Sequence, residues 1–226
     1  MALNLRSAVS HVNKNGMLLI FPLSNRAEPR SLWAQFFPRT EMRWEWDQDG
    51  DTKVADLWHL RERLSTSRQV VYSKWYRGRA TVMSFEVFKA LFRRLGSRES
   101  LSFQAREILD VLDENSPQST KSLKQAVGLK GRELERHYSA AMKELWSRLL
   151  IVAFGEVDEG AFPSLAMGTS KAIFEDLCIE AAALDLDEAE AILDRYLPKG
   201  SAFRKYADEV ERRLVRLTNE HHSDSM

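Results

Sequence analysis

The stretch that decides the fold is residues 102–167, SFQAREILDVLDENSPQSTKSLKQAVGLKGRELERHYSAAMKELWSRLLIVAFGEVDEGAFPSLAM. Ser102 is a typical N-cap, and the apolar residues after it recur at helical spacing until Pro117. Ser119 or Thr120 can cap a second, short helix that closes at Gly128. The turn that follows has the length expected between the two helices of a helix-turn-helix.

A third helix and a hairpin complete this unit. Apolar residues spaced four, three, four and four apart predict a helix that buries one face, and they are Leu134, Tyr138, Ala141, Leu145 and Leu149. Residues 150–154 and 162–167 can form two strands around the turn at Asp158-Glu159-Gly160. Three helices followed by a hairpin predict a winged helix-turn-helix.

Working outward, the flanking segments differ in composition. Residues 1–96 hold five of the six tryptophans and mix short apolar runs with helical patterns, which predicts an aromatic-rich basic α/β segment. Residues 169–226 carry three helical stripes and then a tail, 219–226, that is expected to fray. The predicted fold is mainly α with a minor α+β component, in three parts: 1–96, the winged helix at 97–168, and the helices of 169–226.

Composition excludes several classes of protein. The chain has 226 residues, of which 44% are hydrophobic, and no apolar run is long enough to span a bilayer. One cysteine, Cys178, rules out a disulfide framework and a cysteine-rich zinc site, and the histidines lack metal-ligand spacing. No phosphate loop, dinucleotide turn or nucleophile elbow is present. We expect a cytoplasmic protein with no membrane partner, no metal, no small-molecule cofactor and no catalytic residue.

The overall charge balance hides an asymmetry. The chain has 33 basic and 33 acidic side chains. Residues 1–96 nevertheless carry a net charge of +7, residues 97–168 carry −2 and residues 169–226 carry −5. Because such asymmetry along a chain bears on its partners, nucleic acid remains a possible partner.

The third helix of the middle unit offers the first group of candidate DNA ligands. At about 100° per residue, Arg132, Arg136 and Lys143 fall within roughly 40° of one another, opposite the apolar stripe. Lys130 precedes them in the turn. A recognition helix needs such a cationic face. The alternative is an ordinary solvent-exposed helix face, which also carries Arg and Lys. Glu133, Glu135 and Glu144 flank the three cations.

A second basic group lies in a segment without acidic residues, between Glu62 and Glu86. Its candidate DNA ligands are Arg68, Lys74, Arg77 and Arg79, and they alternate with Tyr72, Trp75 and Tyr76. Cations beside aromatics can hold phosphates and stack bases. The alternative is that the aromatics belong to the core and that the cations pair with the acidic C-terminal third.

The predicted wing is acidic. Glu156, Asp158 and Glu159 surround its turn, and carboxylates at a wing tip would repel phosphates. We therefore expect the wing to stay off DNA. Winged helices also serve as interaction modules, so the fold alone does not fix the function.

Several stretches resemble the AlkZ-related branch of the AlkZ/YcaQ winged-helix DNA glycosylase superfamily: Gly16–Pro22, Ser31-Leu32-Trp33, Lys74–Thr81, and the helix-turn-helix through Phe154. The resemblance covers about residues 1–200 and implies a winged-helix core with a nucleic-acid-related role. Glycosylases of that superfamily position water with a Gln-x-Gln or Gln-x-Asp motif. None of the six glutamines here fits it; the nearest stretch is Gln48-Asp49-Gly50.

These observations favour a winged-helix protein that binds DNA without catalysis. An interaction or self-association module is the alternative, suggested by the acidic wing and by the tryptophans between Trp33 and Trp75. A glycosylase for alkylated bases is a third and weaker hypothesis, because no residue can be nominated for the chemistry.

Overall fold

The computed structural model describes residues 3–44, 52–129, 134–158 and 163–223. Its helices are α1 (Leu5–Asn15), α2 (Leu32–Phe36), α3 (Thr52–Thr66), α4 (Phe85–Leu95), α5 (Phe103–Glu114), α6 (Thr120–Ala126), α7 (Glu135–Ser147), α8 (Ser170–Ile173), α9 (Glu175–Ala183), α10 (Leu186–Tyr196) and α11 (Ala202–Ser223). Its strands are β1 (Met17–Leu19), β2 (Val71–Ser73), β3 (Thr81–Met83), β4 (Gln118–Ser119), β5 (Ile151–Asp158) and β6 (Pro163–Thr169).

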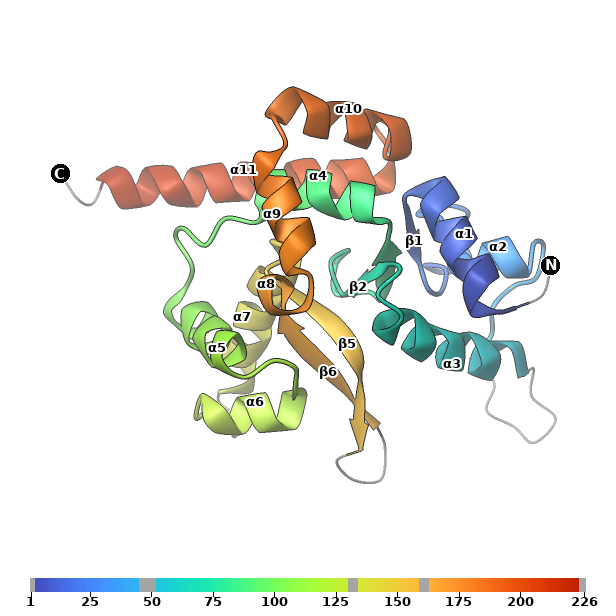
Figure 1. The fold of residues 1–226 in the computed structure, drawn as a ribbon, viewed down its shortest axis with the longest axis horizontal. Coiled ribbons are helices and arrows are strands. Elements are labelled where there is room, and N and C mark those ends of the chain that lie inside the picture. Colours follow the sequence, from blue (N-terminus) through green and yellow to red (C-terminus); the bar gives the residue numbers. More distant parts are fainter. Residues whose placement is uncertain (1–2, 45–51, 130–133, 159–162, 224–226) are drawn as a thin grey trace.

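The strands form one sheet in the order β1-β3-β2-β5-β6-β4, and neighbouring strands run antiparallel (Figure 1). Strand β2, from the N-terminal segment, pairs with β5 through Tyr72 opposite Ala153. The sheet therefore continues from residues 1–96 into residues 97–168. The domain boundaries stay a prediction.

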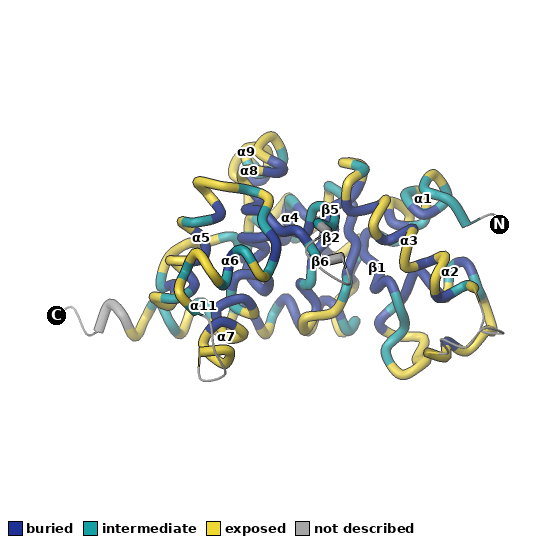
Figure 2. The backbone as a smooth tube through the Cα atoms, turned by 90° about the horizontal axis from the view of Figure 1, so that it is seen from below, coloured by how far each residue is buried: buried dark blue, intermediate teal, exposed yellow. Residues whose placement is uncertain are grey.

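Alternation along the strands divides the buried residues between two cores. Leu18, Tyr72 and Val82 face a core with α1, α3, α5 and α7, whereas Met17, Val71 and Met83 face a core with α4, α10 and α11. Because successive side chains of a strand point to opposite faces, the sheet is the shared middle layer. Figure 2 shows this buried layer between exposed outer helices, and Figure 1 shows α11 extending beyond the other elements.

Local sequence signals explain where the elements begin and end. The side chains of Ser102 and Ser119 cap α5 and α6 as predicted, Ser84 caps α4, and Asp185 caps α10 in a capping box with Glu188. Gly16 ends α1 at a φ of 73°, where a Cβ atom would lie 2.5 Å from Cβ of Tyr196. The predicted starts of α5 and α6 are thereby confirmed.

A bulge in β5 depends on Gly155, which has a φ of 81°. Its N–H donates to Oγ of Ser65 on α3 over 3.0 Å, and an added Cβ would approach Thr66 to 3.1 Å. Glycine suits both the left-handed backbone and the close approach. The bulge therefore fixes the hairpin to α3.

Three details differ from the expectations. The strands of the hairpin are longer than predicted, because the pairing continues to Asp158 and Pro163. The stripe that starts at Ile173 is divided into α8 and α9 at Phe174. The predicted tail is helical up to Ser223, as the last turns of α11.

The prediction of a mainly α fold with a smaller β component is confirmed, and the β component is a six-stranded antiparallel sheet. Within the described ranges, no helix combines the length and the apolar character needed to cross a bilayer.

Candidate nucleic-acid interface

Helix α7 has one buried and one exposed side, as its spacing predicts. Tyr138, Ala141 and Leu145 are buried, whereas Arg136 and Lys143 are exposed. The ion pairs that α7 makes within the described residues involve its acidic side chains instead, with Lys124 bonded to Glu135 over 2.6 Å and Arg148 to Glu144 over 2.7 Å. The cations on its outer face are therefore unpaired in the part of the chain that the structure describes.

Two predictions about this helix are not met by the described residues. Leu134 was expected on the buried face, but it precedes the first turn and is 36% exposed. Lys130 and Arg132, two of the candidate DNA ligands, lie outside the described residues.

The aromatic residues of the second basic group belong to the core. Tyr72 and Trp75 are 1% and 0% exposed, and Tyr76 is also buried. Nε1 of Trp75 donates to the carbonyl of Ser147 over 3.1 Å, which ties the β2–β3 connection to the end of α7. The interpretation of these rings as a base-stacking surface is wrong, because hydrophobic burial places all three inside.

The four cations of this group have different surroundings. Arg68 donates to the carbonyl of Ile173 over 3.0 Å and lies 5.1 Å from the ring centre of Phe154. Lys74 is half-buried, and burial followed by the charge of Arg61 lowers its pKa below the ordinary lysine value. Arg68 and Lys74 are thus partly engaged in the fold.

Arg77 and Arg79 lie on the outside of the β2–β3 connection. Arg77 forms a long ion pair of 3.8 Å with Glu209 of α11, and both side chains are exposed. Arg79 is exposed as well, and its side chain has no partner within the described residues. Exposed pairs of this length contribute little to stability, so Arg77 remains available to an anion.

Helix α11 links the two groups of candidates. Glu209 pairs with Arg77 and also, over 3.1 Å, with Arg213. Arg213 in turn lines the same cavity as Lys143 of α7. The structure therefore brings Arg77 and Lys143 close to the same stretch of α11, around Glu209 and Arg213.

The outer face of α11 adds cations that we did not predict. Four exposed basic residues follow one another at helical spacing, and they are Lys205, Arg212, Arg213 and Arg216. The spacing was visible in the sequence, but the net charge of −5 in residues 169–226 concealed it.

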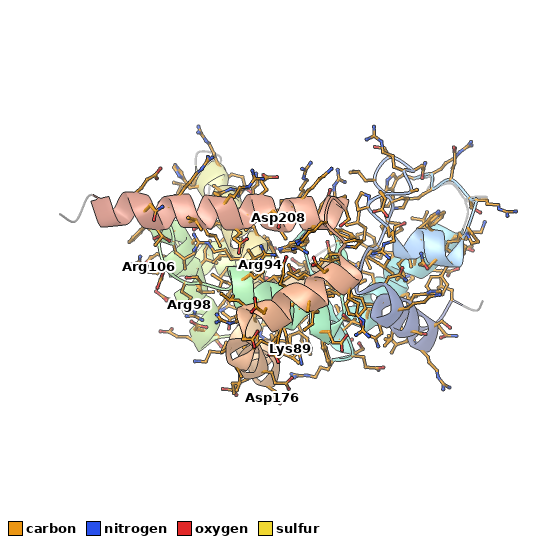
Figure 3. All side chains as sticks on the ribbon, turned by 90° about the horizontal axis from the view of Figure 1, so that it is seen from above. Lys89, Arg94, Arg98, Arg106, Asp176 and Asp208 are labelled. Carbon is orange, nitrogen blue, oxygen red and sulfur yellow. The ribbon has the colours of Figure 1, made fainter. Side chains whose placement is uncertain are left out.

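Four of the acidic residues in residues 169–226 pair with two largely buried arginines, Arg94 and Arg204. Arg204, 3% exposed at its side chain, bonds to Asp194 over 2.8 Å, to Asp208 over 3.2 Å and to Glu190. Arg94 of α4 shares Glu190 and Asp208 and also bonds to Glu211 (Figure 3). These carboxylates are therefore paired between α4, α10 and α11, away from the cations of α7.

The acidic wing is also partly neutralised. Glu156 was expected beside the turn of the hairpin, but it forms an ion pair with Arg61 of α3 in which the side chains are 12% and 7% exposed. Asp158 ends β5, and Glu159 lies outside the described residues. The prediction of three free carboxylates is wrong for Glu156, because the bulge at Gly155 directs it to α3.

No catalytic constellation emerges from the described residues. They contain no group of three or more histidine, cysteine or acidic residues arranged to hold a metal ion. Cys178 is half-buried, and burial raises the pKa of its thiol to about 11. That thiol is protonated at neutral pH and a poor nucleophile.

A comparison with protein families matches residues 3–208 to the family described as AlkZ related. Neither the curated proteins nor the solved structures gave a match. The family match covers most of the chain, including the sheet and both groups of candidate DNA ligands. The chain therefore belongs to the AlkZ-related family.

Proposed function

We propose that this protein binds DNA without catalysis and that α7 is its recognition helix. The observation that carries the proposal is the outer face of α7, where Arg136 and Lys143 are exposed and unpaired among the described residues. Between them lie only Ser139 and Ala140 on that face, so the backbone can come close to a groove. Phosphates attract cations placed in this way.

We further propose that residues 97–168 form a winged helix. The order α5, β4, α6, α7, β5, β6 supports this, since three helices are followed by an antiparallel hairpin and β4 adds to its free edge. In helix-turn-helix proteins the recognition helix enters the major groove. In this unit α7 holds that position in the chain.

Arg77 and Arg79 are proposed to contact phosphates beside α7. Arg77 adjoins α11 on the side where Arg213 and Lys143 line one cavity. A duplex against α7 would also pass the cations of α11. Arg68 and Lys74 are expected to contribute less, because a carbonyl and partial burial already engage them.

The absence of catalysis in this proposal rests on the sequence, which lacks Gln-x-Gln and Gln-x-Asp. Release of a damaged base from alkylated DNA is the assay that would contradict it. A duplex of the same sequence without lesions gives the background rate.

The binding experiment is a salt series with a short duplex, at 50 and 200 mM salt. We expect binding at the lower salt and a steep loss at the higher salt, since each phosphate contact contributes about 0.9 to the slope of log affinity against log salt. Arg136→Gln with Lys143→Gln should reduce this slope by about 2. Arg195→Gln, at an exposed position of α10, is the matched control and should change nothing. Undetectable binding at 50 mM salt would contradict the proposal.

One observation favours a second candidate function, self-association. Trp44 and Trp58 are 56% and 40% exposed and flank Phe21, with ring centres 5.0 and 6.5 Å from it. Trp33 and Trp75 are buried, so they cannot take part. Light scattering tests this function: a monomer at all concentrations would exclude it, and a dimer lost on Trp58→Ser would support it.

A further inference from the structure

A cavity of about 520 Å³ opens between the start of α5, the outer side of α7 and the middle of α11. Its walls are largely apolar and come from Leu101, Phe103, Ala140, Val210, Leu214 and Leu217. Phe103 is 70% exposed, which is unusual for a residue of its size. The volume lies within the range of roughly 300–1,000 Å³ found for small-molecule sites.

Three cations and one carboxylate line the same cavity: Lys143, Arg213, Arg148 and Glu144. Glu144 is already satisfied, since it accepts from Arg148 over 2.7 Å and from the hydroxyl of Ser102 over 2.7 Å. The two exposed cations therefore remain for a ligand, because the pair between Arg213 and Glu209 is solvent-exposed and weak.

Arg148 is the third cation of the cavity wall, and it is held within the protein. Its side chain is 2% exposed, and its two terminal nitrogens donate to Glu144 and to the carbonyls of residues 97, 99 and 100. Its Nε is buried and has no hydrogen-bond partner among the described residues. Because this nitrogen is closed to solvent, Arg148 contributes positive charge to the cavity wall but no hydrogen bond to a ligand.

We propose that this cavity binds a small aromatic anion. The aromatic body would lie between Phe103 and the leucines of α11, and its carboxylate or phosphate would meet Lys143 and Arg213. The ligand needs both an aromatic body and an anionic group, since the walls are largely apolar and two exposed cations line them.

Naphthoate is a probe with this chemistry, and naphthamide is its uncharged analogue. By titration calorimetry without DNA, we expect naphthoate to bind with a dissociation constant of about 10 μM–1 mM. Naphthamide should bind at least roughly tenfold more weakly, because it lacks the charge-assisted hydrogen bonds. Equal affinity for the two compounds, or no saturable binding of naphthoate, would overturn the proposal.

Variants locate the site. Phe103→Ser and Arg213→Gln should each weaken naphthoate binding by roughly tenfold, and both residues are exposed enough for the variants to fold. Arg195→Gln is the control and should leave it unchanged. Binding that persists in both cavity variants would place the ligand elsewhere and reject this site.

One consequence rests on the proposed DNA binding. Lys143 belongs both to the cavity and to the outer face of α7, so a bound anion should weaken DNA binding, and DNA should weaken naphthoate binding by the same factor. The calorimetric titration needs no DNA. A protein that does not bind DNA can therefore still bind naphthoate. A protein that does not bind naphthoate can still bind DNA, so the two proposals are tested separately.

Discussion

The β2–β3 connection and helix α7 carry similar side chains in opposite environments. In the connection, Trp75 and Tyr76 are buried and Lys74 is half-buried, so the rings hold the two layers of the fold together. On α7, Tyr138 is buried in the same way, but Arg136 and Lys143 project outward without partners in the described residues. A sequence that mixes cations and aromatics therefore indicates a nucleic-acid surface only where the aromatic rings are exposed and not packed in the core.

The largest difference between the two regions should appear in stability. Trp75→Ala removes a fully buried ring and its hydrogen bond to Ser147, so the free energy of unfolding should fall by up to about 5 kcal/mol. Arg136→Ala on α7 should change it by less than about 0.5 kcal/mol, because that side chain is exposed. Urea unfolding followed by circular dichroism measures both. Similar losses of unfolding free energy for the two variants would contradict the assignment of Trp75 to the core and of Arg136 to the surface.

A smaller effect is expected at the ion pair that fixes the hairpin to α3. Arg61→Met leaves the carboxylate of Glu156 poorly solvated and without its partner, which should cost about 3 kcal/mol. It also removes the contact between Arg61 and the ring of Trp58, whose centre lies 4.0 Å away.

The double variant Arg61→Met with Glu156→Gln separates charge from packing. It should recover part of the loss, because no unpaired charge remains. A double variant less stable than Arg61→Met would show that Glu156 stabilises the hairpin through other contacts.

The smallest effect concerns the protonation of Lys74. Its folded-state pKa is lowered, so the folded chain holds this proton less tightly than the unfolded chain. The free energy of unfolding should therefore rise slightly as the pH increases from the folded-state pKa of Lys74 toward the ordinary pKa of lysine. In a titration of methyl-labelled lysines by nuclear magnetic resonance, Lys74 should titrate below the ordinary lysine value.

Arg61→Met should then raise the pKa of Lys74, since the charge of Arg61 is the second cause of the shift after burial. The Lys74→Arg variant assigns the resonance. A Lys74 pKa that stays the same without Arg61 would mean that burial alone produces the shift.

Periodicity and capping made the helices predictable. Ser84, Ser102 and Ser119 mark three helix starts in the sequence, and each caps its helix in the structure. The sheet was less visible, because β1, β2 and β3 have three residues each, too few for a period to show. The pairing of Tyr72 with Ala153 is a long-range contact that no local pattern encodes.

The candidate interface was predictable only in part. The outer face of α7 followed from helical angles, since an amphipathic helix must expose the residues opposite its apolar stripe. The roles of Trp75 and Glu156 depended on tertiary partners, Ser147 and Arg61, which lie 72 and 95 residues away in the chain. The negative net charge of residues 169–226 also concealed the exposed cations of α11, because the carboxylates that cause it include Glu211 and Asp208, which pair with Arg94 and Arg204.

The most direct test compares two double variants for binding to the same duplex at 50 mM salt. Arg136→Gln with Lys143→Gln removes cations from α7, and Arg68→Gln with Lys74→Gln removes the same number from the β2–β3 region. We predict that the α7 pair weakens binding by roughly tenfold or more, whereas the second pair, once shown to be folded, binds like the unaltered protein. Equal losses, or a larger loss in the second pair, would contradict the account.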